Sequence, residues 1–167
     1  AAWASGLGEG AATGALDETR LGPPTPRPTK VFAIGLNYKS HAAEAGLPLP
    51  EQPMVFTKFQ NCVVGPRADV KLSSGYVDWE VELAVVIGKS GVYISERDAL
   101  DHVLGYCIGI DFSERDFQFN RGGQGFKGKS ADTFAPLGPF LATRDEIADP
   151  QKLSMHLKVN GVTKQSG

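Results

Sequence analysis

Cysteine is scarce in this 167-residue sequence, which contains only Cys62 and Cys107. Neither residue belongs to a spacing that is typical of metal binding or of redox chemistry. Each lies among apolar residues, where a free cysteine behaves as a small hydrophobic side chain. The sequence therefore gives no sign of a disulfide framework or a cysteine-based metal site, and it fits the reducing environment of the cytoplasm.

Long apolar runs and an excess of charge of one sign are also missing. No stretch approaches the roughly 20 apolar residues of a membrane-spanning helix, and residues 1–20 lack the basic and apolar regions of an export signal. The net charge is −2, and no run of basic residues points to a nucleic-acid surface. We therefore predict a cytoplasmic protein without a nucleic-acid or membrane partner.

The remaining composition is that of a globular domain, because 41% of residues are hydrophobic and 22% are charged. Residues 1–30 are rich in alanine and glycine and then in proline, so we predict an N-terminal segment and connector before one domain over 31–167. Short apolar stretches that favour strands are separated by two short helical patterns. The expected strands are 31–38, 54–59, 77–88, 103–111 and 153–167, and the expected helices are 39–46 and 95–103.

Turn and cap residues refine these boundaries. Ser40 can cap the first helix and Gly46 can end it. The dipeptide Asn160-Gly161 predicts a hairpin turn within the last strand segment. Only six residues follow this turn, so we expect a sheet that is unfinished at the C-terminal end.

Two carboxylates interrupt the apolar stretch 77–88. Glu80 and Glu82 are two residues apart, so on a strand they project from the same face, roughly 7 Å apart at the backbone. Because an unpaired buried carboxylate is costly, we expect either a shared divalent cation or Lys and Arg partners from neighbouring strands. Asp111 adds a third carboxylate beside the small residues of 103–111. Three oxygen donors favour Mg²⁺ or Mn²⁺, with Ca²⁺ as a further possibility, over zinc.

Two further patterns could carry chemistry. His41 and Glu44 have the i, i+3 spacing of one helix face, which outlines a general base and its orienting carboxylate, although two exposed residues would have the same spacing. Residues 123–130, GQGFKGKS, match a phosphate-binding pattern but lack the strand before it and the helix after it. We therefore expect a mobile glycine-rich loop that presents Lys129 to an anionic substrate, and a nucleotide-binding protein is the weaker alternative.

These patterns, in this order, resemble the fumarylacetoacetate hydrolase family. The resemblance is carried by IGLNYKSHAAEAG, VDWEVELAVVIGK, GYCIGIDFSERDFQ, KGKSADTFAPLGPFL and LKVNGVTKQSG, between about residues 31 and 167. It implies a mixed α/β, sheet-rich fold of the family's roll type, usually dimeric. The chain ends before the strands and the glycine- and threonine-rich loop with which family members continue, so we expect a domain without its C-terminal strands.

The resemblance also assigns roles to residues. It implies that Glu80, Glu82 and Asp111 bind the metal, that His41 and Glu44 activate water, and that Arg115, Gln118 and Lys129 contact metal-linked water or a small anionic 2-oxo acid substrate. The implied reaction is metal-dependent hydrolysis of a C–C bond in a 2,4-dioxo acid of the acylpyruvate or fumarylpyruvate type. Decarboxylase, isomerase or lyase activity within the family is the first alternative. A non-catalytic domain that binds a cation or a small molecule is the second.

Overall fold

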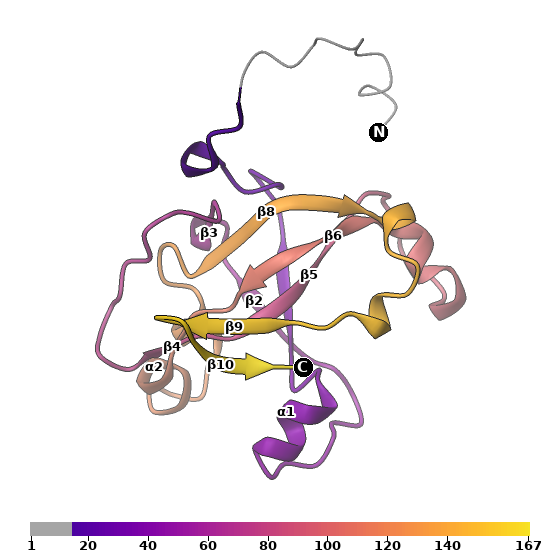
Figure 1. Cartoon of the computed structure of the whole chain (residues 1–167). Helices are drawn as coiled ribbons and strands as arrows, with labels where there is room; N and C mark the ends of the chain where they lie inside the picture. Colours follow the sequence, from indigo (N-terminus) through magenta and orange to yellow (C-terminus); the bar gives the residue numbers. More distant parts are fainter. Residues whose placement is uncertain (1–14) are drawn as a thin grey trace.

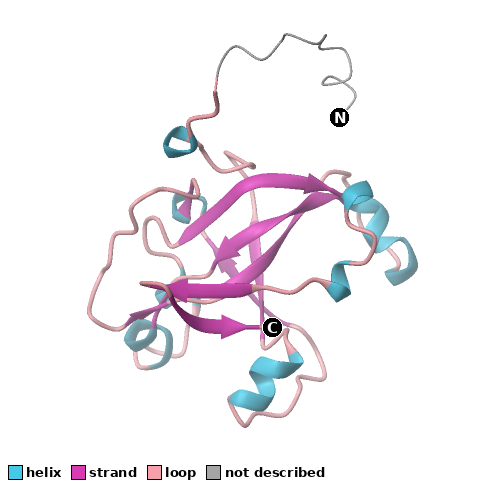
Figure 2. Cartoon of the chain, in the orientation of Figure 1, coloured by secondary structure: helices cyan, strands magenta, loops and turns pink. Residues whose placement is uncertain are grey.

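The computed structural model describes residues 15–167, which form a sheet-rich structure with short helices (Figures 1 and 2). The strands are β1 (Val31–Gly35), β2 (Met54–Lys58), β3 (Val63–Val64), β4 (Val77–Asp78), β5 (Val81–Ile87), β6 (Val103–Ile110), β7 (Ser113–Glu114), β8 (Ala135–Thr143), β9 (His156–Val159) and β10 (Val162–Ser166). The α-helices are α1 (Lys39–Glu44), α2 (Arg115–Phe119) and α3 (Phe126–Lys129). The 3₁₀ helices are η2 (Glu18–Arg20), η3 (Gln60–Cys62), η4 (Glu96–His102), η5 (Arg144–Glu146) and η6 (Pro150–Lys152).

The central sheet has the strand order β3-β8-β6-β5. β5 and β8 are antiparallel to β6, and the short β3 is parallel to β8. In the β5–β6 register, Glu82 lies opposite Gly109 and Ala84 lies opposite Cys107. Directly opposed residues share a face of a sheet, so Glu82 and the small residues of β6 lie on one face.

Three smaller antiparallel pairs accompany the central sheet: β1–β2, β4–β7 and β9–β10. The β9–β10 hairpin turns at Asn160 and Gly161, whose φ values are 51° and 81°. Two successive positive φ values belong to the type I′ turn that Asn-Gly favours. The predicted C-terminal hairpin is therefore confirmed.

Side chains from other elements cover the first half of the outer edge of β5. The backbone N–H of Val81 donates to Gln165 Oε1 of β10 at 2.9 Å, and the N–H of Leu83 donates to the hydroxyl of Tyr38 at 3.1 Å. Tyr38 immediately precedes α1, so the same contact fixes the start of this helix against β5. Two distant parts of the chain are thus attached to the strand that carries Glu82.

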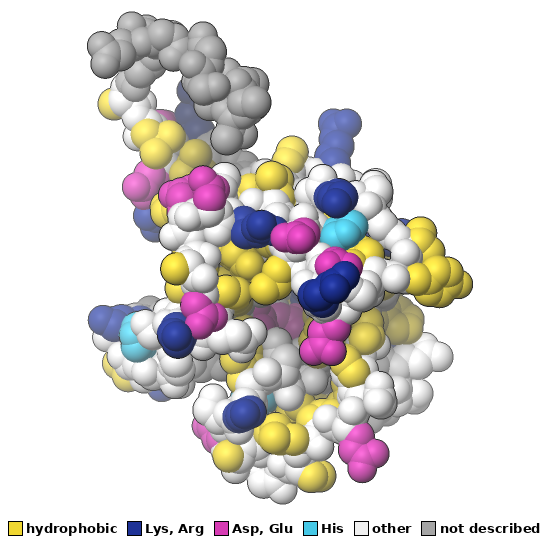
Figure 3. Space-filling view, turned by 90° about the vertical axis from the view of Figure 1, so that its right-hand side faces the viewer, with side chains coloured by type: hydrophobic (Ala, Val, Ile, Leu, Met, Phe, Trp, Pro, Cys, Tyr) yellow, Lys and Arg dark blue, Asp and Glu magenta, His cyan; other side chains and the backbone are white. Residues whose placement is uncertain are grey.

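The buried core is small. Cys62, Phe134 and Ala135 form its centre, and half-buried hydrophobic residues such as Phe112 pack around them. Cys62 and Cys107 are both buried, as predicted, and both are free thiols. Large hydrophobic side chains also reach the surface, where they lie among charged groups (Figure 3).

Several predicted boundaries are wrong. The expected strand 77–88 is divided into β4 and β5, and Glu80 lies between the two, so strand alternation does not place its side chain. The expected strand 31–38 stops at Gly35, because Leu36 adopts a φ of 51° that a strand cannot contain. The expected helix 95–103 is the 3₁₀ helix η4.

The start of the first helix also differs from the prediction. Tyr38, and not Ser40, occupies the capping position, and no side chain caps the helix there. The helix ends as expected, because Gly46 has a φ of 64° and its N–H donates to Ala43 O. Within residues 15–167, no helix has the length and apolar character needed to cross a membrane.

Candidate active site

Glu80 and Asp111 meet where β5 begins and β6 ends. The backbone N–H of Asp111 donates to Glu80 O at 2.8 Å, which holds the two residues together just beyond the β5–β6 ladder. Both side chains point to the Lys129 ammonium, whose Nζ lies 2.6 Å from Glu80 Oε2 and 2.9 Å from Asp111 Oδ2. Residues that are 49 and 18 positions from Lys129 in sequence are thus joined by one cation.

The two remaining oxygens of these carboxylates also contact cations. Arg115 Nη2 lies 2.8 Å from Glu80 Oε1, and Lys58 Nζ lies 2.5 Å from Asp111 Oδ1. Each of the four oxygens therefore accepts a hydrogen bond from a positively charged group. Burial alone would raise the pKa of Glu80, but Lys129 and then Arg115 outweigh it and lower this pKa.

Lys58 is a site residue that the sequence analysis missed. Its side chain is buried in β2, and its ammonium also donates to the carbonyl oxygens of Phe112 and Lys129, at 3.3 and 2.5 Å. Burial lowers its pKa, while Asp111 acts in the opposite direction. The one available signal was a single lysine inside the apolar stretch MVFTKF, where a buried cation needs a partner.

Arg115 and Gln118 lie together on α2, one turn apart. Arg115 Nη1 donates to Gln118 Oε1 at 2.9 Å. Its Nε and Nη2 both donate to Asp78 Oδ2, at 3.2 and 2.8 Å. Asp78, at the end of β4, therefore orients the guanidinium that contacts Glu80, and it is a second residue that the sequence analysis did not identify.

Glu82 differs from the other two carboxylates because, in the described part of the chain, no ion pair involves it. Burial raises its pKa to about 7, and the negative charges of Asp111 and Glu80 act in the same direction. Hydrogen bonds from Tyr38 and Asn37 act in the opposite direction. The three predicted metal ligands therefore lie close enough for the charges of two of them to raise the pKa of the third.

The geometry of the cluster bears on the predicted metal site in two ways. Among residues 15–167, no three His, Cys, Asp or Glu side chains are already arranged around one position that could hold a metal ion. Cationic partners, the alternative drawn from the sequence, are present for Glu80 and Asp111. The donor set nevertheless fits a hard cation, since three carboxylates lie near one another at one end of the sheet.

His41 and Glu44 lie on α1, which starts beside β5 through Tyr38. Both side chains are exposed. Within residues 15–167, no hydrogen bond or ion pair joins them to each other or to the three carboxylates. The structure thus does not bring this pair into the cluster, and its role stays a prediction.

The prediction of a mobile loop around Lys129 is wrong. Residues 126–129 form α3, and the Lys129 side chain is only 3% exposed. α3 packs closely on neighbouring backbone, because a Cβ on Gly128 would lie 2.3 Å from Glu114 O. No strand precedes this segment, so the nucleotide-binding context is also absent from the described residues.

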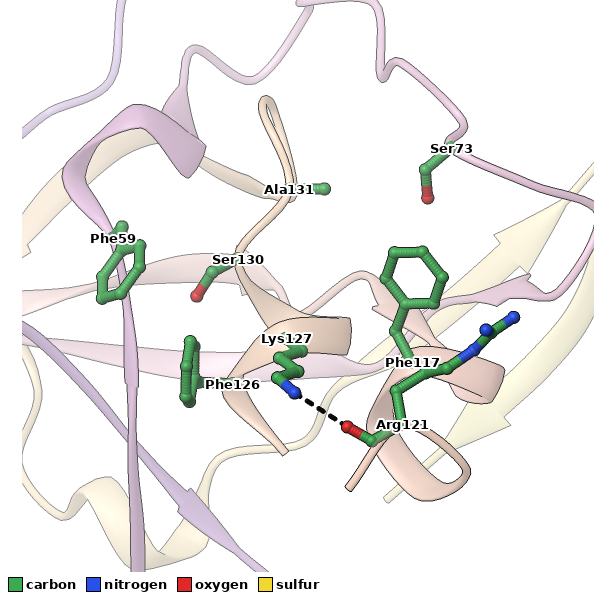
Figure 4. A pocket seen from close by; sticks show the side chains of 8 residues that line it. All are labelled: Phe59, Ser73, Phe117, Arg121, Phe126, Lys127, Ser130 and Ala131. Carbon is green, nitrogen blue, oxygen red and sulfur yellow. Dashed lines mark hydrogen bonds between the residues drawn. The ribbon is translucent and has the colours of Figure 1, made fainter. Parts of the chain in front are cut away.

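Cavities flank the cluster without enclosing it. One of about 490 Å³ lies beside α2 and α3, with aromatic walls from Phe59, Phe117 and Phe126 and with Lys127 donating to Arg121 O at 2.8 Å (Figure 4). None of its lining residues is a predicted site residue. A second cavity, of about 590 Å³, is polar and includes Arg115 in its wall.

Comparison with known sequences identifies the family. The profile described as fumarylacetoacetate (FAA) hydrolase C-terminal matches residues 30–167. A provisionally named hydrolase of Burkholderia ambifaria is 50% identical over 152 residues, which make up 90% of this chain and 54% of that protein. The chain thus spans about half the length of the curated relatives that it matches.

Solved structures agree with this assignment and confirm the expected mixed, sheet-rich fold. The fumarylacetoacetate hydrolase of Exiguobacterium antarcticum has a TM-score of 0.80 and 35% identity, with 93% of this chain and 56% of that chain covered. The 5-carboxymethyl-2-hydroxymuconate delta-isomerase of Mycobacterium smegmatis has a TM-score of 0.73 and 37% identity, with 83% and 52% covered. The profile match covers most of the chain, and the chain belongs to the fumarylacetoacetate hydrolase family.

Proposed function

We propose that this chain carries the active site of a metal-dependent hydrolase that cleaves a C–C bond in a 2,4-dioxo acid of the acylpyruvate or fumarylpyruvate type. The observation that carries the proposal is the cluster of Glu80, Glu82 and Asp111 with Lys129 and Arg115. It combines hard oxygen donors with cations that can bind an anionic substrate. Membership of a family that includes a named hydrolase supports it.

The three carboxylates are the proposed ligands of Mg²⁺ or Mn²⁺. When bound, such an ion would supply Lewis-acid polarisation of substrate oxygens. Arg115 presents a guanidinium that Asp78 and Gln118 hold in a fixed orientation. A guanidinium and an ammonium match a carboxylate and a keto oxygen, so Arg115, Gln118 and Lys129 are the proposed substrate contacts.

His41 is the proposed general base, with Glu44 as its orienting carboxylate. An imidazole near neutral pH can take a proton from water, and a carboxylate on the same helix face favours that tautomer. α1 starts beside the strand that carries Glu82, which supports this role. Both side chains are exposed, so the proposal requires α1 to approach the cluster when substrate binds.

Isomerase activity is the second candidate. The Mycobacterium smegmatis structure is named as a 5-carboxymethyl-2-hydroxymuconate delta-isomerase, and one from Mycobacterium marinum as a 2-hydroxyhepta-2,4-diene-1,7-dioate isomerase. The first name denotes a hydroxy acid with three carboxylates and the second a hydroxy acid with two, and the same cations would bind such anions. Decarboxylation and lyase chemistry could use the same cluster of residues. The proposed form of the enzyme is a homodimer in the cytoplasm.

The deciding experiment is a turnover assay with acylpyruvates, fumarylpyruvate, oxaloacetate and a carboxymethyl-hydroxymuconate, each with Mg²⁺, Mn²⁺ or EDTA. Metal-dependent release of pyruvate from the dioxo acids would support hydrolysis. Ultraviolet changes without C–C cleavage would instead identify isomerisation. Glu80→Gln and Asp111→Asn should abolish turnover, while Lys127→Met, an exposed change on α3, should not. Metal-dependent stability without any turnover would favour a non-catalytic binding domain.

A further inference from the structure

The three cations of the cluster are not held equally firmly. Lys58 contacts Asp111, but it also donates to the carbonyl oxygens of Phe112 and Lys129. Its side chain is buried within β2. Loss of the carboxylate contact would leave this ammonium with two backbone acceptors, so its position does not depend on Asp111 alone.

Arg115 is likewise held by groups other than Glu80. Its guanidinium makes two bonds to Asp78 and one to Gln118. These three contacts use all three of its nitrogen atoms. The guanidinium would therefore keep its place if Glu80 turned to another partner.

Lys129 has no such additional acceptor in the described part of the chain. Its Nζ donates only to Glu80 Oε2 and Asp111 Oδ2, and it lies 5.3 Å from the centre of the Phe56 ring. Both oxygens belong to proposed metal ligands. The ammonium that is least tied to the rest of the protein thus contacts the two oxygens that a metal ion would use.

A divalent cation and this ammonium would compete for the same oxygens. Mg²⁺ binds carboxylate oxygen at about 2.0–2.1 Å, and two cations a few ångströms apart in a buried site repel each other strongly. The other two oxygens are held by Arg115 and Lys58. Release of Lys129 is therefore the change that opens the cluster to a metal ion at the smallest loss of other contacts.

We propose that the Lys129 ammonium is an internal counter-ion of Glu80 and Asp111 that a divalent cation displaces, and that this displacement makes Lys129 free to bind the anionic substrate. The inference rests on the proposed metal-dependent function and adds the order in which the cation and the substrate bind. The cation binds first, and the substrate binds second to an amine that had been occupied. Lys129 therefore couples the two binding events.

The first test measures Mn²⁺ affinity by electron paramagnetic resonance of the free ion. Lys129→Met keeps the aliphatic chain but removes the competing charge, and Lys127→Met makes the same change two residues earlier on α3, away from the carboxylates. We expect Lys129→Met to bind Mn²⁺ at least about tenfold more tightly than the wild type, which is about 1.4 kcal/mol. Lys127→Met should bind like the wild type. Equal or weaker Mn²⁺ binding by folded Lys129→Met would overturn the inference.

The second test uses the unaltered protein, so it does not depend on the folding of a variant. A short pulse of acetic anhydride followed by mass spectrometry reports the exposure of each lysine. Lys129 should be protected in EDTA and become several-fold more reactive in Mg²⁺, whereas exposed Lys127 should react equally in both. Unchanged protection of Lys129 while Mn²⁺ binds would refute displacement but leave the metal site intact. Absence of Mn²⁺ binding in every form would reject both the inference and the proposed metal-dependent function.

Discussion

Glu82 is the residue of the cluster whose charge is least compensated. Its pKa of about 7 means that the folded protein prefers the neutral carboxyl over much of the acidic range. In the unfolded chain the same group ionises near its usual value of about 4.3. Folding therefore raises this pKa, and the resulting stability is fully present below pH 4.3 and is lost as the pH rises toward 7.

We expect Glu82→Gln to remove this pH dependence. Wild-type stability in EDTA should fall between about pH 4.3 and pH 7 by at most about 3 kcal/mol, because one pKa unit corresponds to about 1.4 kcal/mol. The variant, which cannot ionise, should lose less over this range. Urea unfolding at pH 5 and pH 7.5 measures the difference. Parallel losses in the two proteins would contradict the raised pKa.

His41 can be tested independently of the carboxylates. If it is the base, His41→Ala should lower kcat by roughly 10²- to 10⁴-fold, with little change in thermal stability because the side chain is exposed. Lys39→Ala is a matched control, since it changes another exposed residue of α1. Steady-state kinetics with the best dioxo acid distinguishes the two. A wild-type rate for His41→Ala would remove this residue from the mechanism.

The sequence predicted several residues of the cluster, but not the contacts among them. Glu82 and Asp111 could be predicted because strand alternation and small neighbours are local patterns. The contacts of Lys58 could not, because its partners lie 53 to 71 positions away along the chain. Asp78 was missed for the same reason, because its partner Arg115 lies on α2, 37 positions away along the chain.

At the scale of elements, α3 is positioned by a close backbone contact. Gly128 allows α3 to approach Glu114 O and the Cβ of Gln118, which would lie 2.3 and 2.8 Å from an added Cβ. The next residue is Lys129. The position of the ammonium between Glu80 and Asp111 thus depends on the glycine that precedes it.

We expect Gly128→Ala to destabilise the fold by about 1–3 kcal/mol, because backbone must move to admit the methyl group. The shift should also displace Lys129 and raise its reactivity toward acetic anhydride in EDTA. Gly125→Ala is the control, because an added Cβ there meets nothing within 4 Å, and it should change stability by less than about 0.5 kcal/mol. Thermal denaturation compares the two variants. Equal stability would contradict the close contact.

Local patterns predicted the elements well where the backbone rule is strict. The Asn160-Gly161 turn was correct because few residue pairs accept two positive φ values. The division of 77–88 could not be predicted, because it depends on distant partners. β4 pairs with β7 whereas β5 pairs with β6, and Glu80 between them contacts side chains of α2 and α3. Ser40 satisfied a capping pattern, but contact of Tyr38 with β5 fixed the helix start instead.

At the scale of the whole molecule, residues 15–167 leave an apolar face exposed on the β1–β2 pair. Ile34 lies opposite Val55, and Phe32 lies two residues from Ile34 on the same face. Their exposed fractions are 39%, 59% and 61%, respectively. Adjacent exposed apolar residues of this kind mark surfaces that associate.

We expect the 167-residue chain to associate at micromolar concentration through this face. Sedimentation velocity should show an average mass that rises with protein concentration. Val55→Ser should weaken the association, because it replaces an exposed apolar group at the centre of the face. Leu72→Ser, which alters an exposed apolar residue between β3 and β4, should leave it unchanged. Association that is insensitive to Val55→Ser would exclude this surface.

The side chains that cover the outer edge of β5 have a consequence for fibre formation. A bare edge offers unpaired N–H groups to strands of other copies, and repeated addition of such strands produces cross-β fibrils. Here Gln165 and Tyr38 already accept the hydrogen bonds of Val81 and Leu83. An incoming strand would have to displace both side chains and detach the C-terminal hairpin from β5. The first half of β5, which carries Glu82, is thereby hindered from templating amyloid growth.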